Sequence, residues 1–155
     1  MKGRSFVTAE LQTRTVRSAD GTAIGFVTVG SGPAVIVVHG ALTTGDEWHQ
    51  VAVAMADHHT VHVMDRRGRG RSGDGADYRF DREIEDIGAV VEAAGVGAHL
   101  VGHSSGAIYA LEAARRFPIG QLVLYEPPLN FKGREAATLV ETMRVKRYEE
   151  NSMMP

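Results

Sequence analysis

The most constraining feature of this chain is a Gly-x-Ser-x-Gly pentapeptide over residues 102–106. An apolar segment over residues 98–101 leads into it, and an alanine-rich segment over residues 104–117 follows it with apolar residues at helical spacing. The pentapeptide therefore predicts a sharp turn that joins a strand directly to a helix. Its two glycines leave room on either side of Ser104, where a Cβ would collide with neighbouring backbone.

Strand-like and helix-like segments alternate along the rest of the chain. Strands are predicted over residues 11–17, 22–29, 34–38, 60–64, 98–101 and 121–125, and helices over residues 48–56, 81–94, 104–117 and 131–148. In the second strand Ile24 and Phe26 face one side, and Val27 and Val29 face the other. This alternation predicts an α/β fold, a three-layer mostly parallel sheet with helices on both faces. Acidic residues in the first turns of the helix over residues 81–94 suit the polarity of a helix.

Composition narrows the class of protein. The chain has 155 residues, a net charge of −2 and no cysteine, so disulfides and thiolate metal sites are excluded. The charge predicts no attraction to nucleic acid or to anionic membranes, and no apolar run approaches the roughly 18 residues of a membrane span. We expect a cytoplasmic protein with no nucleic-acid or membrane partner.

Two patterns that resemble ligand sites are discounted. Residues 68–73 match G-x-G-x-x-G after a strand, but Asp74 and Asp77 follow where a nucleotide-binding helix would begin. His58, His59 and His62 are close in sequence, but no carboxylate or cysteine completes a metal set with them. We therefore expect neither a cofactor nor a metal.

The turn around Ser104 suits nucleophilic chemistry. A strand-to-helix turn raises the serine hydroxyl above the sheet and holds its backbone in a strained conformation. The helix that follows begins with free N–H groups and a partial positive charge. The N–H of Ser105 can therefore donate to an oxyanion that develops on a substrate.

A second loop is expected on the same rim of the sheet. His39 and Gly40 follow the buried strand over residues 34–38, and ligand sites of open α/β sheets lie at the carboxyl ends of strands. The N–H of Ala41, or of Leu42 if the loop is shifted, is the natural second oxyanion donor. We interpret His39 as a brace of this loop, because a side chain fixed there is poorly placed to take the proton of a serine.

Together these segments resemble the α/β-hydrolase fold family, in its serine-nucleophile branch, from about residue 13 to residue 130. The resemblance rests on Asp20-Gly21, His39-Gly40, the Asp65-Arg66-Arg67-Gly68-Arg69-Gly70-Arg71-Ser72 loop, Gly102-His103-Ser104-Ser105-Gly106 and Tyr125-Glu126-Pro127-Pro128. It implies that Ser104 is the nucleophile and that Ala41 and Ser105 supply the oxyanion hole, with His39 and Gly40 forming the oxyanion loop. The expected reaction is hydrolysis of an ester or related acyl bond in a small-molecule substrate. Haloperoxidase or C–C hydrolase chemistry on the same scaffold stays open.

After Ser104 this sequence departs from the family pattern of catalytic residues. Family members order their triad as serine, acid and histidine, but the 51 residues after Ser104 contain neither His nor Asp. Glu126 follows the sixth strand, where some members carry the acid; we interpret it as a solvated or ion-paired loop carboxylate. We expect residues 1–130 to form the N-terminal part of a hydrolase core, truncated after about strand six, and residues 131–155 to begin a lid helix or a tail. The alternative is a catalytically inactive fold that acts as a binding module.

Residues 122–125 are apolar on both faces, which is typical of a central strand. Without a further strand beside it, this segment would be an exposed sheet edge. Either the helix predicted from residue 131 folds back over this edge, or the edge pairs with another chain. We expect the isolated chain to be only marginally stable or to self-associate.

Overall fold

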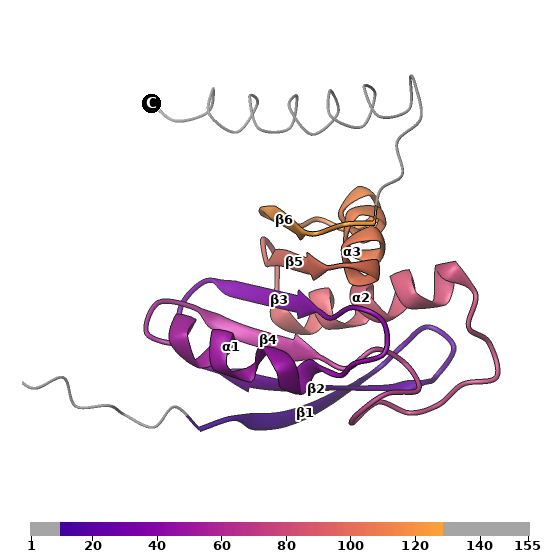
Figure 1. Cartoon of the computed structure of the whole chain (residues 1–155), viewed down its shortest axis with the longest axis horizontal. Coiled ribbons are helices and arrows are strands. Elements are labelled where there is room, and N and C mark those ends of the chain that lie inside the picture. The colour runs from indigo at the N-terminus through magenta and orange to yellow at the C-terminus, as the bar shows by residue number, and fades with distance from the viewer. Residues whose placement is uncertain (1–9, 129–155) are drawn as a thin grey trace, which may run out of the picture.

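Five mostly apolar segments and one mostly polar segment, separated by turn residues, form the six strands of one sheet (Figure 1). The computed structural model describes residues 10–128. The strands are β1 (Gln12–Arg17), β2 (Ala23–Val29), β3 (Ala34–Val38), β4 (Thr60–Met64), β5 (His99–His103) and β6 (Leu122–Tyr125). The helices are the 3-10 helix η1 (Gly45–Trp48), α1 (His49–Met55), α2 (Phe80–Ala94) and α3 (Ser105–Arg116).

The strand order is β1-β2-β4-β3-β5-β6. Strands β4, β3, β5 and β6 are parallel to one another, whereas β2 is antiparallel to both β1 and β4. Helices connect the parallel strands, as such crossovers require. The predicted mostly parallel α/β sheet is therefore confirmed, and its first two strands form an antiparallel hairpin.

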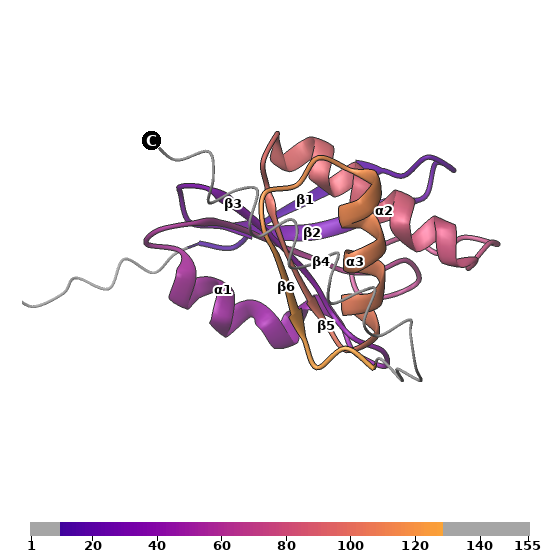
Figure 2. The ribbon, with the colours of Figure 1, turned by 90° about the horizontal axis from the view of Figure 1, so that it is seen from above.

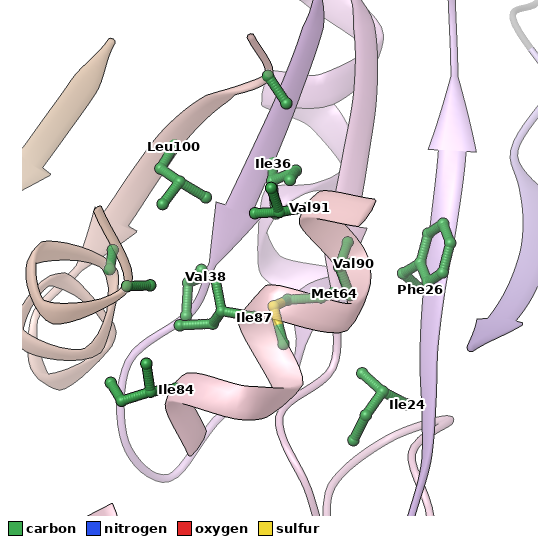
Figure 3. Close-up of a cluster of buried hydrophobic side chains, with 13 residues drawn as sticks. Ile24, Phe26, Ile36, Val38, Met64, Ile84, Ile87, Val90, Val91 and Leu100 are labelled. Atoms are coloured by element: carbon green, nitrogen blue, oxygen red, sulfur yellow. The ribbon is translucent and has the colours of Figure 1, made fainter. Parts of the chain in front are cut away.

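Helix α1 covers one face of the sheet, and α2 and α3 cover the other (Figure 2). The two sides of β2 enter different cores, as the sequence predicts: Ile24 and Phe26 pack on the side of α2, and Val27 and Val29 pack on the side of α1. Figure 3 shows the larger core, where Ile84, Ile87 and other residues of α2 lie against the sheet. Strand β3 is buried on both faces because a helical layer lies on each side of it.

The boundaries differ from the prediction around the pentapeptide. Strand β5 continues to His103 because its backbone pairs in parallel with β6 up to Tyr125. Helix α3 begins at Ser105, since the positive φ of Ser104 is not helical. The predicted helix over residues 131–148 and the division at residue 130 lie outside the described residues.

Within the described sheet, β6 is an edge strand that pairs only with β5. Val123 is 53% exposed and Tyr125 is 52% exposed. Over residues 10–128, no helix has both the length and the apolar character that crossing a membrane requires.

Candidate active site

The turn between β5 and α3 has the strained geometry that the pentapeptide predicts. Ser104 has φ 52° and ψ −124°, a conformation that non-glycine residues rarely adopt. The flanking glycines are required by close packing. A Cβ on Gly106 would collide with the carbonyl oxygens of Val38 and His39, and one on Gly102 would lie 2.5 Å from the Cα of Ala107. The turn therefore depends on glycine at both positions.

The loop after β3 lies directly beside this turn. Strands β3 and β5 are parallel neighbours with Val38 opposite Gly102, so the loops that follow them share one rim of the sheet. A Cβ on Gly40 would lie 3.1 Å from the Cβ of Ser104, which leaves room for glycine and little more. Gly40 is buried, whereas Ala41 is exposed. The structure thus brings together the loop and the serine that the sequence placed on one rim.

His39 is fully buried and braces the loop with both ring nitrogens. Its Nδ1 lies 2.8 Å from the carbonyl oxygen of Gly40, and its Nε2 accepts from the backbone N–H of Arg66 at 3.0 Å. A carbonyl oxygen only accepts, so Nδ1 carries the proton and the ring is neutral. Burial lowers the pKa of His39, which favours this neutral form. Both nitrogens are engaged, so the prediction that His39 is a structural brace is confirmed.

Arg66 joins this loop to the turn at Ser104 and was missed by the sequence analysis. Its Nη1 donates to the carbonyl oxygen of Gly40 and to the hydroxyl of Ser105, both at 3.2 Å. Its Nε and Nη2 donate to the two carboxylate oxygens of Glu83 at 2.9 and 2.6 Å. The guanidinium also lies 4.5 Å above the ring of Tyr109. One buried cation therefore contacts the loops after β3 and β5 and the helices α2 and α3.

The neighbouring residues hold the loop after β4 in place. Arg67 is fully buried and pairs with Asp86 of α2 and with Asp20 of the first hairpin. Asp65 is also buried, and its carboxylate accepts from the backbone N–H groups of Gly45 and Arg71. The D-x-R-G-x-G-x-S segment therefore acts here as a structural clamp.

The acidic residues of α2 were attributed to helix polarity, but two of them have a different role. Glu83 and Asp86 are buried and bind Arg66 and Arg67. The available signal was their spacing of three residues, which places two carboxylates on one helical face opposite a pair of adjacent arginines.

Aromatic side chains gather beside the serine turn. The rings of Trp48, His103 and Tyr125 lie 5.2 to 6.4 Å apart between centroids. Glu126 follows Tyr125 with φ 48° and is exposed, so its carboxylate is solvated in this structure. His103 belongs to the pentapeptide, but its ring packs into this cluster.

Two cavities of the described part of the chain lie away from the Ser104 rim. The larger, about 400 Å³, is lined by residues at the amino ends of β3, β4 and β5, together with Arg14 and His62. A second, about 320 Å³, adjoins it and shares both of these residues. His62 is hydrogen-bonded to Thr28 at 2.9 Å, and no cluster of three metal-ligating side chains is present in residues 10–128. We place the candidate site at the Ser104 rim because the strained serine and the adjoining loop lie there.

Comparison with known proteins agrees with this fold. Residues 35–150 match the model of the alpha/beta hydrolase family. The chain belongs to the alpha/beta hydrolase family.

Three similar proteins are named as a deformylase, an esterase and an alpha/beta hydrolase. The chain is 39% identical over 112 residues to N-formylmaleamate deformylase of Pseudomonas putida, a match that covers 69% of this chain and 42% of the relative. It is 37% identical over 123 residues to pimeloyl-[acyl-carrier protein] methyl ester esterase of Methylococcus capsulatus, covering 73% and 46%. The crystal structure of an alpha/beta hydrolase from Sphaerobacter thermophilus superposes with a TM-score of 0.74 at 41% identity, covering 86% of this chain and 55% of that one. The chain thus spans about half the length of these relatives.

Proposed function

We propose that this protein hydrolyses an ester or related acyl bond of a small molecule, with Ser104 as the nucleophile. The observation that carries the proposal is the backbone of Ser104, whose φ of 52° presents the residue on a sharp turn between β5 and α3. Gly40 lies against it, so a second loop is available to bind the reacting group. Such a constellation belongs to nucleophilic acyl transfer.

In the proposed reaction the Oγ of Ser104 attacks the carbonyl carbon of the substrate. The carbonyl oxygen takes up the negative charge and accepts hydrogen bonds from the backbone N–H groups of Ala41 and Ser105. Collapse of the tetrahedral intermediate expels the leaving group and leaves an acyl-enzyme, which water then hydrolyses. His39 and Gly40 form the wall of this oxyanion hole.

The proton of Ser104 needs an acceptor that no residue of this chain is assigned to provide. His39 uses both ring nitrogens in the loop, and no histidine follows Ser104 in the sequence. Within this chain the proposed roles are therefore those of the nucleophile and of the oxyanion donors.

The names of the relatives support acyl chemistry as the substrate class. One is a deformylase and another is a methyl ester esterase, so both names refer to an acyl group or an ester. Hydrolysis of either bond uses the same tetrahedral intermediate, which the proposed oxyanion hole would stabilise. The choice between an ester and a related acyl bond is left to assay.

Covalent labelling tests the proposal. A fluorophosphonate should modify the wild-type chain at a single residue, and Ser104→Ala should abolish the modification. Ser31→Ala is the matched control, because Ser31 is an exposed serine in the turn between β2 and β3. Mass spectrometry of the labelled peptide identifies the site. A folded wild type that does not label would overturn the hydrolase proposal for this chain and favour the alternative, a binding module.

A further inference from the structure

Arg66 lies beneath both loops of the candidate site and is only 4% exposed. Its Nη1 is the one guanidinium nitrogen that contacts them, with the carbonyl oxygen of Gly40 and the hydroxyl of Ser105 each 3.2 Å away. These two acceptors belong to the two segments that would supply the oxyanion donors. Arg66 is therefore a physical link between the two halves of the proposed oxyanion hole.

The rest of the guanidinium is held in one orientation. Glu83 accepts from Nε and Nη2 in a bidentate pair, which fixes the plane of the group as well as its position. Tyr109 packs against the face of that plane. With three contacts fixing the guanidinium in this way, Nη1 has a defined direction toward the loops.

This direction determines how the peptide between Gly40 and Ala41 is oriented. Its carbonyl oxygen accepts two hydrogen bonds, from the Nδ1–H of His39 at 2.8 Å and from Arg66. The described chain has no cis peptide, so the N–H of Ala41 points opposite to this carbonyl. Because the carbonyl of Gly40 points toward Arg66, the N–H of Ala41 points away from the protein interior, toward the exposed side of the loop.

The second half of the hole is held at Ser105. This residue is the first of α3, so its N–H has no acceptor within the helix. The hydrogen bond from Arg66 to its hydroxyl ties the first turn of α3 to the loop after β3. A single side chain therefore contacts both segments that carry the proposed donors.

We propose that Arg66 is a positioning residue that orients the N–H groups of Ala41 and Ser105 as an oxyanion hole. This inference rests on the proposed function. Its action is through hydrogen-bond geometry, since the charge of the guanidinium is balanced by the carboxylate of Glu83. A lysine at this position would keep the charge but could not bind Glu83 in two places and reach both loops.

The decisive variant is Arg66→Lys, and Arg67→Lys is its matched control. Both replace a buried arginine that forms a bidentate pair with a carboxylate of α2, but Arg67 makes no hydrogen bond to Gly40 or Ser105 in the described structure. The first readout is the kinetics of fluorophosphonate labelling at Ser104. Because losing a full oxyanion donor costs about 10²–10³ in rate, we expect displaced donors to lower the maximal rate of labelling about 10-fold in Arg66→Lys and the control to change it less than about 2-fold. The inhibitor concentration at half-maximal rate should stay unchanged.

The second readout does not depend on the labelling reaction. Residual dipolar couplings of the Ala41 and Ser105 amides report the directions of these N–H bonds in the free protein. We expect both couplings to change in Arg66→Lys and to keep their wild-type values in Arg67→Lys. Unchanged couplings in a folded Arg66→Lys variant would overturn the inference.

The two readouts separate the failure of this inference from the failure of the proposed function. If the wild type does not label, the proposed function fails, and the couplings still decide whether Arg66 orients the two amides. If the wild type and Arg66→Lys label at equal rates, the positioning role of Arg66 fails, while the assignment of Ser104 as the nucleophile is unaffected.

If Arg66→Lys does not fold, Ser105→Ala is the second variant. It removes the hydroxyl that accepts from Arg66 and keeps the backbone N–H of residue 105. A changed Ser105 coupling with slower labelling would then support the role, and wild-type values of both would overturn it.

Discussion

Arg67 and Asp86 form a bidentate ion pair, with both N–O distances 2.7 Å, in which neither side chain is accessible to solvent. Asp20, in the turn of the first hairpin, binds the same guanidinium at 2.9 Å and is partly exposed. The pair thus ties the loop after β4 to α2 and to the hairpin. Together the two carboxylates raise the pKa of Arg67 further above its ordinary value, so it stays charged at every accessible pH.

Removing Asp86 should be more damaging than removing Asp20. Asp86→Ala leaves a buried cation with its main partner missing, which typically costs about 3–5 kcal/mol of unfolding free energy. Asp20→Ala should cost less, because water can solvate the exposed side of the gap. Urea denaturation of both variants measures the difference. An equal loss would mean that the buried pair contributes no more than the partly exposed one.

The sequence predicts the sheet and the serine turn because both depend on local patterns. Successive side chains of β2 point to alternate faces of the sheet, so the sequence indicates which of them enter each core. The glycines of the pentapeptide indicate where backbone segments are in close contact. Gly102 is needed at a contact with Ala107 within the turn itself, which a local pattern can indicate. Gly106 is needed where α3 meets the carbonyl oxygens of Val38 and His39, so the local pattern indicates the need for glycine there but not the segment that it contacts.

The ion pairs beneath the site could not be predicted in the same way. Arg66 and Glu83 are 17 residues apart, and their contact depends on how α2 packs across the sheet. An acidic first turn of a helix has a sufficient local explanation in the helix dipole, so nothing in the sequence required a buried partner. The roles of Ser104, Ala41 and Ser105 remain predictions that labelling will test.

Gly106→Ala should disturb the site through a direct collision. Its Cβ would meet the carbonyl oxygens of Val38 and His39, and backbone at this position cannot move freely between β3 and α3. Overpacking of this kind typically costs about 1–3 kcal/mol of unfolding free energy. Gly73→Ala is the control, because its Cβ would meet ordinary contacts of 3.4 Å or more. Thermal or urea unfolding compares the two, and equal stabilities would contradict the packing argument.

The backbone strain at Ser104 should be measurable as a difference between two variants. Glycine tolerates φ 52° without penalty, whereas alanine keeps the Cβ that causes the strain. We expect Ser104→Gly to be more stable than Ser104→Ala by about 1 kcal/mol. The same pair at Ser105, which is helical, should show the reverse order by about 0.5–1 kcal/mol. Urea titrations of the four variants measure both stability differences. A Ser104→Ala variant that is more stable than Ser104→Gly would contradict backbone strain at position 104.

Acid should weaken the fold through His39. Burial lowers its pKa in the folded state, so the unfolded chain binds a proton first as the pH falls below about 6.5. Stability is therefore complete above that pH and is lost toward the lower folded pKa, by up to about 1.4 kcal/mol per pH unit for each such histidine. His39→Gln removes this titration and should flatten the profile below about pH 6.5. Some slope should persist, because burial also lowers the pKa of His62. A variant with the full wild-type slope would contradict the assignment to His39.

Within residues 10–128 no strand lies beside the outer edge of β6, and we expect the 155-residue chain to self-associate with a second copy through it. Among the strands of the described sheet β6 pairs only with β5, and Val123 and Tyr125 are each about half exposed on it. Unpaired N–H and C=O groups beside exposed apolar side chains are a template for pairing with another strand. Val123→Lys places a charge on this edge strand and should shift the protein toward monomer. Val96→Lys is the matched control, since Val96 is 97% exposed in the turn after α2 and lies outside β6. Sedimentation velocity over a range of concentrations distinguishes the cases, and a wild type that stays monomeric throughout would rule out self-association through β6.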